Sequence, residues 1–572
     1  MLEKLIQSRL QSRVREILPE ANLATVLVRP CPDLKFGDYQ SNALMAIAKE
    51  RKQNPRKLAE EVVAGLDVSE WCEPVEIAGP GFLNFRAKTE AVTEVLKSAS
   101  RGDHLFFERT KAPRNIIVDF SSPNVAKPMH VGHIRSTILG DALVRSLRLL
   151  GHHVVTDNHI GDWGTQFGKL LIGWKQDLNR TNLEQNPLAE MGRLYKQVNA
   201  RFEADDGIKT LARQELVNLQ QGDPENLKIW REMIDLSLQE FGKVYSRLAI
   251  QFDHVLGESF YNSQLKGVAK NLLDLGLAQE SEGATVVFFE KSTGWSDPAI
   301  ILKSDGGANY TTTDLATLEY RLKTWQPAEI VYVTDARQQL HFQQLFHIFR
   351  RWHPVAEVSL SHVWFGMILG PDGTPFKTRT GENIELNALL DEAEERALAT
   401  VTEKNPDLPE KERLEIARVV GIAAVKYSDL LPNRQSDYRF DWDKMLALTG
   451  NTAVYLLYAY TRIRSVARKA AEAGAGASVE ALQLTLPSEL ALAKHLLRFG
   501  LSIEAMAAEY RPNYLCNYLF ELAGLFSQFY ENCPVLKAEG SDRSSRLVLC
   551  ELTGRVLKKG LEILGIETTE RM

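Results

Sequence analysis

Cysteine is scarce in this chain and follows no metal-binding or disulfide pattern. The 572 residues contain five cysteines, and no two of them form a C-x-x-C pair. An odd number of widely spaced thiols argues against a disulfide framework and against a zinc ribbon. We therefore expect buried, reduced thiols, and no protein-bound zinc, at Cys31, Cys72, Cys516, Cys533 and Cys550.

Long hydrophobic runs and a leader sequence are also missing. No apolar stretch reaches the roughly 20 residues that a membrane-spanning helix needs. The first twenty residues, MLEKLIQSRLQSRVREILPE, include three glutamates and have no apolar core of the kind that signal peptides carry. These absences predict a cytoplasmic protein with no membrane partner.

Neither sign of charge dominates the composition. The net charge is −6 at pH 7, with 44% hydrophobic and 25% charged residues, as in ordinary globular proteins. This charge disfavours a histone-like coat for nucleic acid but leaves room for a local basic face. A chain of 572 residues is too long for one hydrophobic core, so several domains are expected.

Changes in charge and in strand and helix patterns divide the sequence into three regions. Residues 1–110 predict a small α+β domain that ends in a charged, irregular linker at 100–114. Residues 111–435 predict an α/β domain with a mostly helical, charged insertion at about 170–280. Residues 436–572 lack strand signals and predict an all-α domain.

The second region begins with a strand–turn–helix–strand pattern. NIIVDF is an apolar run of strand length, SSPN breaks it, and apolar residues then recur at helical spacing from His133 to the stop at Gly151. HHVVTDN resumes as a strand, and EIVYVTD with RQQLHFQQLFHIFRRW repeats the strand–helix order. A βαβ unit implies a parallel sheet, so we expect an α/β fold of two half-sheets separated by the insertion.

The sequence HVGH stands where the first of these strands gives way to its helix. If the helix begins near His130, then His130 and His133 face the same way, beside the free N–H groups that favour a phosphate. Gly132 would let a ligand approach the backbone, and Lys127 adds a positive charge. Two capping histidines are the plain alternative; a metal site lacks a third ligand of suitable spacing nearby.

A second basic element lies far along the chain, in GPDGTPFKTRTGENI. It offers Lys377 and Arg379 on a glycine-rich loop, which alone would be typical of a solvated surface. Together with HVGH, at the carboxyl edge of a parallel sheet, it predicts a clamp that holds a triphosphate from two sides.

These motifs resemble the class I aminoacyl-tRNA synthetases, and specifically the arginyl-tRNA synthetase family. HVGH is similar to the HIGH signature of that class, and FKTRTG stands where the class has its KMSKS loop. SSPNVAKPMHVGHIRSTILGD, NHIGDWGTQFG and the final IETTERM resemble the arginyl branch, and the resemblance spans the whole chain. It implies a Rossmann-like catalytic domain, an N-terminal tRNA-binding domain and a C-terminal all-α anticodon-binding bundle.

The resemblance also implies a reaction and its partners. ATP with substrate-bound Mg²⁺ would activate L-arginine as an adenylate for transfer to tRNA(Arg), and the protein would act as a monomer. The usual second lysine of the KMSKS loop is missing, and in this family Lys127 is thought to supply the compensating charge. The implied catalytic residues are His130, His133, Lys127, Lys377 and Arg379, and those implied for ATP binding are His130, Gly132, His133 and Lys377.

An arginine substrate calls for planar carboxylates, because a guanidinium forms paired hydrogen bonds with them. Asp119 ends the first strand, and Asp314 follows Tyr310 at helical spacing. From the residues alone, a turn aspartate and a helix N-cap are the alternatives. The family resemblance assigns Asp119 and Asp314 to the guanidinium, Tyr310 to the pocket wall, Ser122, Asn124 and His130 to the amino and carboxylate end, and Gln338, or the adjacent Gln339, to closing the pocket.

Two further sets of residues are predicted to contact tRNA. The helix around TRIRSVARKA is basic and tyrosine-bearing, which suits phosphate contact and base stacking, although a solvated cationic face looks the same. By resemblance, the candidates are Arg462, Arg464, Arg468, Tyr530 and Met572 in the C-terminal region and Phe36, Tyr39, Gln40 and Asn42 in the N-terminal region.

Three rival functions remain open at this point: a class I synthetase for lysine or glutamine, a non-catalytic tRNA-binding relative, and a nucleotidyltransferase for small metabolites. A neutral or acidic substrate would leave Asp119 and Asp314 unpaired in a partly dry pocket, which is costly. The intact histidine pair argues against the second, and the two appended domains argue against the third.

Overall fold

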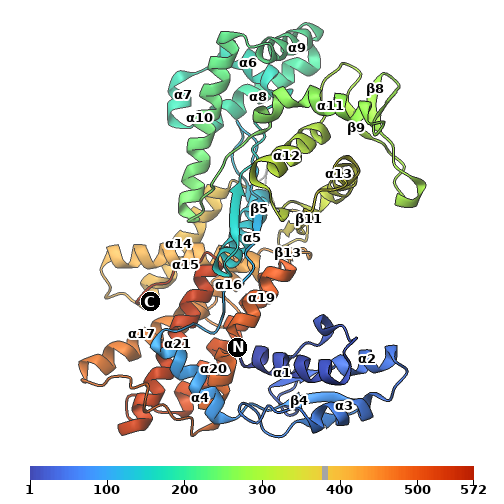
Figure 1. Cartoon of the computed structure of the whole chain (residues 1–572). Helices are drawn as coiled ribbons and strands as arrows, with labels where there is room; N and C mark the ends of the chain where they lie inside the picture. The colour runs from blue at the N-terminus through green and yellow to red at the C-terminus, as the bar shows by residue number, and fades with distance from the viewer. Residues whose placement is uncertain (377–383) are drawn as a thin grey trace.

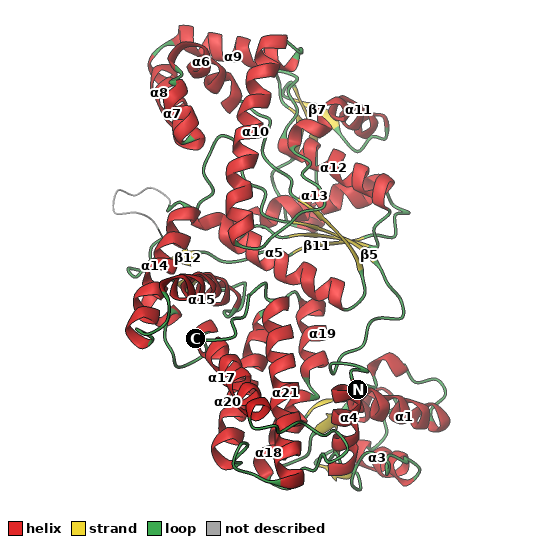
Figure 2. Cartoon of the chain, turned by 90° about the vertical axis from the view of Figure 1, so that its left-hand side faces the viewer, coloured by secondary structure: helices red, strands yellow, loops and turns green. Residues whose placement is uncertain are grey.

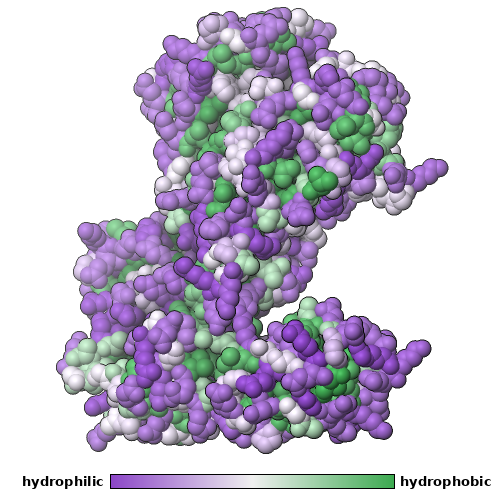
Figure 3. Space-filling model, viewed as in Figure 1, coloured by the Kyte–Doolittle hydropathy of each residue, from purple (hydrophilic) through white to green (hydrophobic). Residues whose placement is uncertain are grey.

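The computed structural model describes residues 1–376 and 384–572. The chain forms an elongated molecule, with a helical bundle at one end, a parallel sheet near the middle and the N-terminal and C-terminal domains at the other end (Figure 1). The space-filling view shows the N-terminal domain as a separate lobe, with a notch between it and the rest of the chain (Figure 3).

The central sheet has four parallel strands in the order β11-β10-β5-β6. Their bounds are β5 (Asn115–Asp119), β6 (His153–Asp157), β10 (Glu329–Tyr332) and β11 (Ser359–His362). Ile116 and Val118 pack into one core with helix α5 (Val131–Leu149), whereas Ile117 packs into a second core with α12 (Tyr310–Trp325) and α13 (Gln339–Trp352). Helices therefore cover both faces (Figure 2), and the predicted α/β fold is confirmed.

A second sheet stands apart from the first. Strands β7 (Gln279–Ser281), β8 (Ala284–Val287) and β9 (Ala299–Leu302) form an antiparallel sheet next to α11 (Leu265–Asp274). These strands follow the predicted insertion but do not join the parallel sheet, which resumes with β10 and β11.

Five helices form the bundle between β6 and this second sheet. They are α6 (Gln166–Asp177), α7 (Arg180–Gln185), α8 (Pro187–Ala204), α9 (Asp206–Gln220) and α10 (Pro224–Arg247). Helix α10 returns to the central sheet, where the Tyr245 hydroxyl shares a hydrogen bond with Ser121 Oγ (2.8 Å) and accepts one from Asn158 (3.0 Å). The bundle is thus joined to the turn that follows β5.

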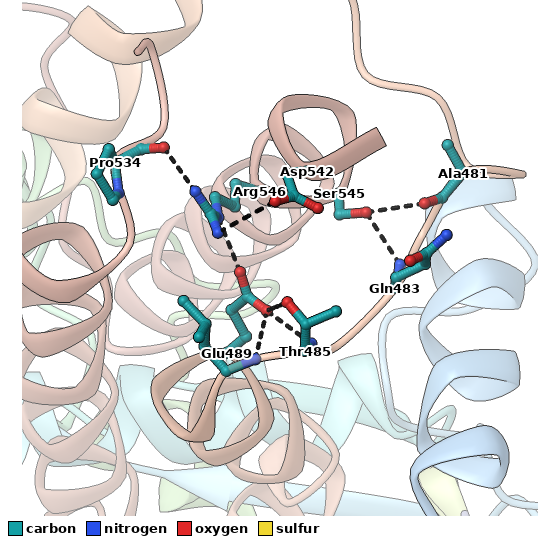
Figure 4. A network of polar contacts seen from close by, with 9 residues as sticks. Ala481, Gln483, Thr485, Glu489, Pro534, Asp542, Ser545 and Arg546 are labelled. Atoms are coloured by element: carbon teal, nitrogen blue, oxygen red, sulfur yellow. Dashed lines mark hydrogen bonds and ion pairs between the residues drawn. The ribbon is translucent and has the colours of Figure 1, made fainter. Parts of the chain in front are cut away.

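The C-terminal part is almost entirely helical. Its helices are α14 (Leu386–Lys404), α15 (Glu410–Leu430), α16 (Trp442–Met445), α17 (Ala453–Glu472), α18 (Pro487–Leu496), α19 (Phe499–Glu509), α20 (Asn513–Asn532) and α21 (Gly540–Ile563). The short strand β12 (Ile368–Leu369) pairs with β13 (Tyr438–Arg439), and β13 lies just beyond residue 435, where strand signals were expected to stop. Helix α18 is fixed to α21 by a buried ion pair between Glu489 and Arg546 (2.8 Å), shown in Figure 4.

The N-terminal domain has a four-stranded antiparallel sheet covered by helices. The sheet order is β1 (Arg29–Pro30), β2 (Tyr39–Ser41), β4 (Phe82–Phe85) and β3 (Glu76–Ala78), and the helices are α1 (Leu2–Ile17), α2 (Ala43–Glu50), α3 (Pro55–Ala64) and α4 (Thr89–Arg101). The Lys494 ammonium on α18 pairs with Asp38 (2.7 Å), and Arg555 on α21 donates to the carbonyl of Ala99 (3.0 Å). These contacts tie the domain to the C-terminal helices.

The helix that follows HVGH is also tied to the C-terminal helices. Arg135 on α5 is buried and pairs with the buried Asp429 on α15 (3.0 Å). Lys426, one turn earlier on α15, donates to the carbonyl of Gly565 (2.6 Å), just after α21. Burial lowers the pKa of Lys426 to about 8. Helix α5 is therefore tied to α15, and α15 is tied in turn to the residue that follows α21.

Candidate active site

The turn after β5 has an unusual backbone. Ser121, Ser122 and Ala126 all have positive φ angles, of 77°, 48° and 63°. Residues with a Cβ rarely adopt this conformation, and three in one turn must be held by their surroundings. Their N–H groups donate to the side chains of Ser136 (2.8 Å), Asn158 (3.0 Å) and Ser237 (3.0 Å). The turn is fixed by α5, the loop after β6 and α10 together.

His130 and His133 form a reciprocal cap at the start of α5. His130 is the N-cap residue, and its Nδ1 accepts a hydrogen bond from the Gly132 N–H (3.0 Å). His133 Nδ1 accepts one from the His130 N–H (3.1 Å), and the two ring centroids lie 4.0 Å apart. The alternative that the two histidines cap a helix is therefore confirmed. It also fixes the chemistry of the pair, because both Nδ1 atoms are used as acceptors.

The electrostatics keep these two imidazoles neutral. Burial, and then the neighbouring His130, lower the pKa of His133 to about 3. Burial, followed by the charges of Lys127 and Arg337, also lowers the pKa of His130. A neutral ring whose Nδ1 accepts carries its proton on Nε2. Each histidine therefore presents one N–H donor, which suits a phosphate oxygen.

Gly132 is needed here for a reason internal to the cap. A Cβ at this position would lie 2.8 Å from Cε1 and 2.9 Å from Nδ1 of His130. Any side chain would push the His130 ring out of its hydrogen bond. The expectation that Gly132 opens the backbone to a ligand stays a prediction, and the cap supplies an independent need for glycine.

Lys127 is exposed and reaches toward the helical bundle. Its ammonium lies 5.6 Å from the ring centroid of Tyr195 on α8. Lys127 also contributes to lowering the pKa of His130, which places its charge near the histidine pair.

The predicted second clamp element falls largely outside the described residues. Lys377 and Arg379 belong to the stretch 377–383, of which the structure describes nothing. The residues that follow it lie against HVGH, since the carbonyl of Ile384 accepts from the Val131 N–H (2.9 Å) and the Leu386 N–H donates to the carbonyl of Met129 (2.9 Å). The chain thus returns to the histidine pair directly after that stretch.

Asp119 is already paired with an arginine of the protein itself. Its Oδ2 accepts from Arg321 on α12 (2.6 Å), and the same guanidinium nitrogen donates to Asp157 at the end of β6 (2.7 Å). The other oxygen of Asp119 accepts from Ser122 Oγ (3.2 Å). Burial, and then repulsion from Asp119, raise the pKa of Asp157, while the arginine opposes both. Residue-by-residue reading of the sequence missed Arg321, which is 202 positions from Asp119.

A second acidic group lies on the first turns of α12. Asp314 Oδ2 accepts a hydrogen bond from His341 Nε2 (2.6 Å), and the His341 ring meets the exposed Tyr310 edge-on at 4.9 Å. Asp314 does not cap its helix, because the N-cap residue is Asn309. The Tyr310–Asp314 pairing expected from the spacing is therefore present on one helix face.

Glu258 is a further carboxyl group whose pKa is affected by Asp314, and the sequence analysis did not find it. Glu258 opens the 3₁₀ helix η2 (Glu258–Gln264). Burial raises its pKa to about 8, with further contributions from the charges of Asp314 and Asp162. A carboxylate placed beside two others in a partly dry site calls for a cationic ligand.

The remaining pocket residues occupy the rim. Asn124 is exposed and forms a parallel β-bridge with Gly161. A Cβ on Gly161 would lie only 2.2 Å from Oδ1 of Asn124. Gln338 is exposed at the end of the 3₁₀ helix η4 (Ala336–Gln338), and Gln339 begins α13. Among residues 1–376 and 384–572, neither glutamine forms a side-chain hydrogen bond that would decide between them.

Comparison with known proteins identifies the family of the chain. Residues 92–442 match the family described as tRNA synthetases class I (R), catalytic domain, which covers more than half of the chain. Residues 456–572 match the DALR anticodon binding domain, and residues 2–87 match the arginyl tRNA synthetase N-terminal domain. The chain belongs to the arginyl-tRNA synthetase family.

Its relatives extend over the full length. This arginyl-tRNA synthetase is 46% identical over 567 residues to the arginine–tRNA ligase of Synechococcus sp., covering 97% of this chain and 96% of the relative. It is 46% identical over 577 residues to that of Escherichia fergusonii, covering 99% and 100%. The crystal structure of the Plasmodium falciparum arginyl-tRNA synthetase superimposes with a TM-score of 0.84 at 29% identity, covering 100% of this chain and 99% of that one.

The predicted tRNA contacts in the C-terminal domain separate into two groups. The Arg462 guanidinium lies 4.9 Å from the Tyr458 ring and 5.4 Å from the Tyr530 ring, and it donates to the Tyr458 hydroxyl (2.9 Å). Tyr458 is 42% exposed and was missed from the sequence. This arginyl-tRNA synthetase thus has two aromatic rings with a guanidinium between them, which suits stacked bases.

Arg464 and Arg468 instead hold the end of the chain. Arg464 donates to the carboxylate of Glu570 (2.8 Å), and Arg468 donates to its carbonyl (3.1 Å). The hydrogen bond to Arg464 is the main reason why the pKa of Glu570 is lowered. Met572, two residues on, packs against the main hydrophobic core. These two arginines anchor the tail that carries Met572.

One predicted N-terminal contact is corrected by the structure. Tyr39 is 3% exposed and packs inside the N-terminal domain, so it cannot stack on a base. Gln40 donates to Asn84 Oδ1 (2.9 Å), and Asn42 is exposed. Phe36 is 45% exposed, with the Lys35 ammonium 4.7 Å from its ring, and remains the best-placed aromatic of the set.

The described residues contain neither a metal-binding cluster nor a membrane-spanning helix. Across residues 1–376 and 384–572, no group of three His, Cys, Asp or Glu side chains is arranged to hold a metal ion. Within the same residues, no helix combines the length and the hydrophobicity needed to cross a bilayer.

Proposed function

We propose that this arginyl-tRNA synthetase joins L-arginine to tRNA(Arg) in two steps, through an arginyl-adenylate. The arginine carboxylate attacks the α-phosphate of ATP and releases diphosphate; a terminal ribose hydroxyl of the tRNA then takes the arginyl group and releases AMP. One observation carries the proposal. A neutral histidine pair and an exposed lysine lie at the carboxyl edge of a parallel sheet, in the same site as an acidic pocket suited to a guanidinium.

ATP would bind at the start of α5. The Nε2–H groups of His130 and His133 donate to phosphate oxygens, and the N-terminus of the helix favours their negative charge. Lys127 adds a full positive charge near the α-phosphate, as does Lys377 from the far loop. Mg²⁺ would arrive bound to the triphosphate and not to a protein cage. The chain stabilises charge and positions the reactants, so no covalent enzyme intermediate is needed.

The guanidinium would bind to Asp314 and Glu258, beside Tyr310. Both carboxylates gain from a planar cation, because it relieves their mutual repulsion. Asp119 is partly satisfied by Arg321, so its remaining lone pairs suit the ammonium end of arginine better than the guanidinium. Ser122 and Asn124 lie next to it on the same turn, and Gln338 lies on the opposite rim.

We propose that the tRNA spans the whole molecule, with its anticodon at the Tyr458–Arg462–Tyr530 cluster and its corner at the N-terminal domain. The three predicted regions, 1–110, 111–435 and 436–572, would then act as one monomer in the cytoplasm. Because the C-terminal helices contact α5, tRNA binding should assist arginine activation.

One assay tests the function. ATP–diphosphate exchange is measured over a panel of amino acids, with and without total tRNA. We expect exchange with arginine alone and a strong dependence on tRNA. Exchange with lysine or glutamine, or none with any amino acid, would refute the arginine assignment, and full exchange without tRNA would refute the tRNA dependence.

The role of Lys127 is tested in the same assay. We expect Lys127→Ala to lower the exchange rate about 10²-fold, in the range of a lost charge contact to the transition state. The matched control is Lys111→Ala, on the irregular segment before β5. Near-normal exchange by Lys127→Ala would show that this lysine does not compensate for the altered second signature.

A further inference from the structure

Besides the contacts of Tyr245 and Ser237 on α10, the helical bundle approaches the turn before HVGH with an aromatic side chain of α8. Tyr195, on α8, has the Lys127 ammonium 5.6 Å from its ring centroid and the Lys169 ammonium 5.8 Å from it. Lys127 belongs to the turn before HVGH, whereas Lys169 belongs to α6 of the bundle. A single ring therefore lies next to two cations that come from different parts of the fold.

The bundle holds this ring firmly. Tyr195, Asn199 and Phe202 follow one another at spacings of four and three on one face of α8. Lys169 contacts all three: its ammonium donates to Asn199 Oδ1 (2.6 Å) and lies 3.9 Å from the Phe202 ring centroid. With three such partners, Lys169 fixes the face of α8 that carries Tyr195.

Lys127, by contrast, has little else to hold it. Its side chain is exposed, and within residues 1–376 and 384–572 it forms no hydrogen bond and no ion pair with a carboxylate. A lysine side chain with four rotatable bonds loses much conformational freedom when it is fixed. Its backbone, in contrast, is rigid, because the preceding Ala126 N–H is bound by Ser237 of α10. Only the ammonium end of the Lys127 side chain still needs a contact that positions it.

The face of a tyrosine ring can position the Lys127 ammonium without neutralising its positive charge. A cation is attracted to the ring quadrupole, yet the ring, unlike a carboxylate, leaves the full positive charge available to an anion. A carboxylate at the same place would compete with the phosphate for Lys127. The contact thus suits a lysine that must be positioned and still bind a polyphosphate.

We propose that Tyr195 is a positioning residue of this enzyme, which holds the Lys127 ammonium at the polyphosphate site. The helical bundle then contributes to the catalytic centre through this residue. The proposal rests on the proposed function, since it requires that Lys127 contact the α-phosphate region of ATP. It assigns to the bundle a role in activation that does not depend on contact with tRNA.

The test is a double-mutant cycle on arginine-dependent ATP–diphosphate exchange, at saturating tRNA. We expect Tyr195→Leu to lower kcat about 5- to 30-fold, as the loss of a partly desolvated cation–π contact does, with the KM for arginine unchanged. Tyr195→Phe keeps the ring and should stay within about twofold of the parent. In the Lys127→Met background, Tyr195→Leu should cause almost no further loss.

Controls separate this role from folding and from the proposed function. Phe202→Leu alters the same face of α8 without touching Lys127, and it should leave the exchange rate within about twofold. Thermal melting of each variant reports on folding. A Tyr195→Leu loss that persists unchanged in the Lys127→Met background, or that Tyr195→Phe shares, would overturn the positioning role. Normal exchange by Lys127→Met would instead overturn the role of Lys127 itself.

Discussion

Asp119 and Arg321 form a buried ion pair of 2.6 Å at the end of β5. The same guanidinium also pairs with Asp157, so two carboxylates share one positive charge. Arg321 is completely buried, and nearby negative groups raise its pKa even though burial alone would lower it. Under the proposed function, the excess of negative charge at this place would favour a cationic substrate.

The first prediction concerns this shared charge. Arg321→Met leaves two buried carboxylates without their partner and should lower the free energy of unfolding by about 3–5 kcal/mol at pH 7.5. The loss should be smaller at pH 5, because the raised pKa of Asp157 lets that carboxyl group take up a proton. Urea unfolding at both pH values measures this. The double variant Arg321→Met with Asp157→Asn removes one charge of each sign and should recover part of the stability; no recovery would argue against the shared ion pair.

The second prediction concerns Glu258. Its pKa of about 8 means that the empty pocket holds a protonated carboxyl group at pH 7, whereas a guanidinium prefers the carboxylate. Arginine binding should therefore release a proton below pH 8, and the Kd should fall as the pH rises from 6.5 toward 8, by up to about tenfold per unit. Calorimetry in two buffers of different ionisation enthalpy counts the protons. In Glu258→Gln, the proton release should disappear and the Kd should rise; unchanged proton release would place the titration elsewhere.

The third prediction concerns the charge state of the histidine pair. Since the pKa of His133 lies at about 3, the exchange rate should show no inflection from His133 between pH 5 and 8. His133→Ala should lower kcat about 10²- to 10³-fold, because it removes a hydrogen-bond donor aimed at developing charge. His133→Asn keeps a donor and should retain more activity. A rate that follows protonation of His133 near pH 6.5 would contradict the neutral-donor role.

The fourth prediction separates the arginines of α17. Arg462→Ala should raise the KM for tRNA about tenfold or more, since stacking on aromatic rings contributes about 1–3 kcal/mol per base. Arg464→Ala should have a smaller effect, similar to that of Glu570→Gln, because both release the C-terminal tail. Diphosphate exchange at saturating tRNA should stay normal in all three. If Arg464→Ala matched Arg462→Ala while Glu570→Gln had no effect, Arg464 would be a direct tRNA contact.

The sequence predicts the core of this fold well where the signal is local. The run from Asn115 to Gly151 combines a buried strand, a proline turn and a helical period, and each of these depends only on near neighbours. The antiparallel sheet of β7, β8 and β9 was not predicted as a separate sheet. Alternation shows that one face is buried, but it does not show against which partner.

The candidate site residues were also predicted where the signal is local. His130 with His133, and Tyr310 with Asp314, could be found because each pair is brought together by its spacing along one helix. Arg321 and Glu258 could not, since their roles come from contacts with Asp119 and Asp314 that the parallel sheet creates between distant segments. Tyr39 was misplaced for the opposite reason: an aromatic residue on a strand can face the core or the solvent, and the sequence around it does not distinguish the two.

The contact of Arg145 with the carbonyl of Glu562 joins residues 417 positions apart. At a synthesis rate of roughly 5–20 residues per second, α5 would leave the ribosome about 20–80 seconds before its partners at the end of α21. During that time Lys426 would lack the Gly565 carbonyl that now accepts its hydrogen bond. The nascent chain should therefore carry an incompletely packed α5 until residues 562–565 emerge, which makes the completion of α21 a natural checkpoint for the appearance of activity.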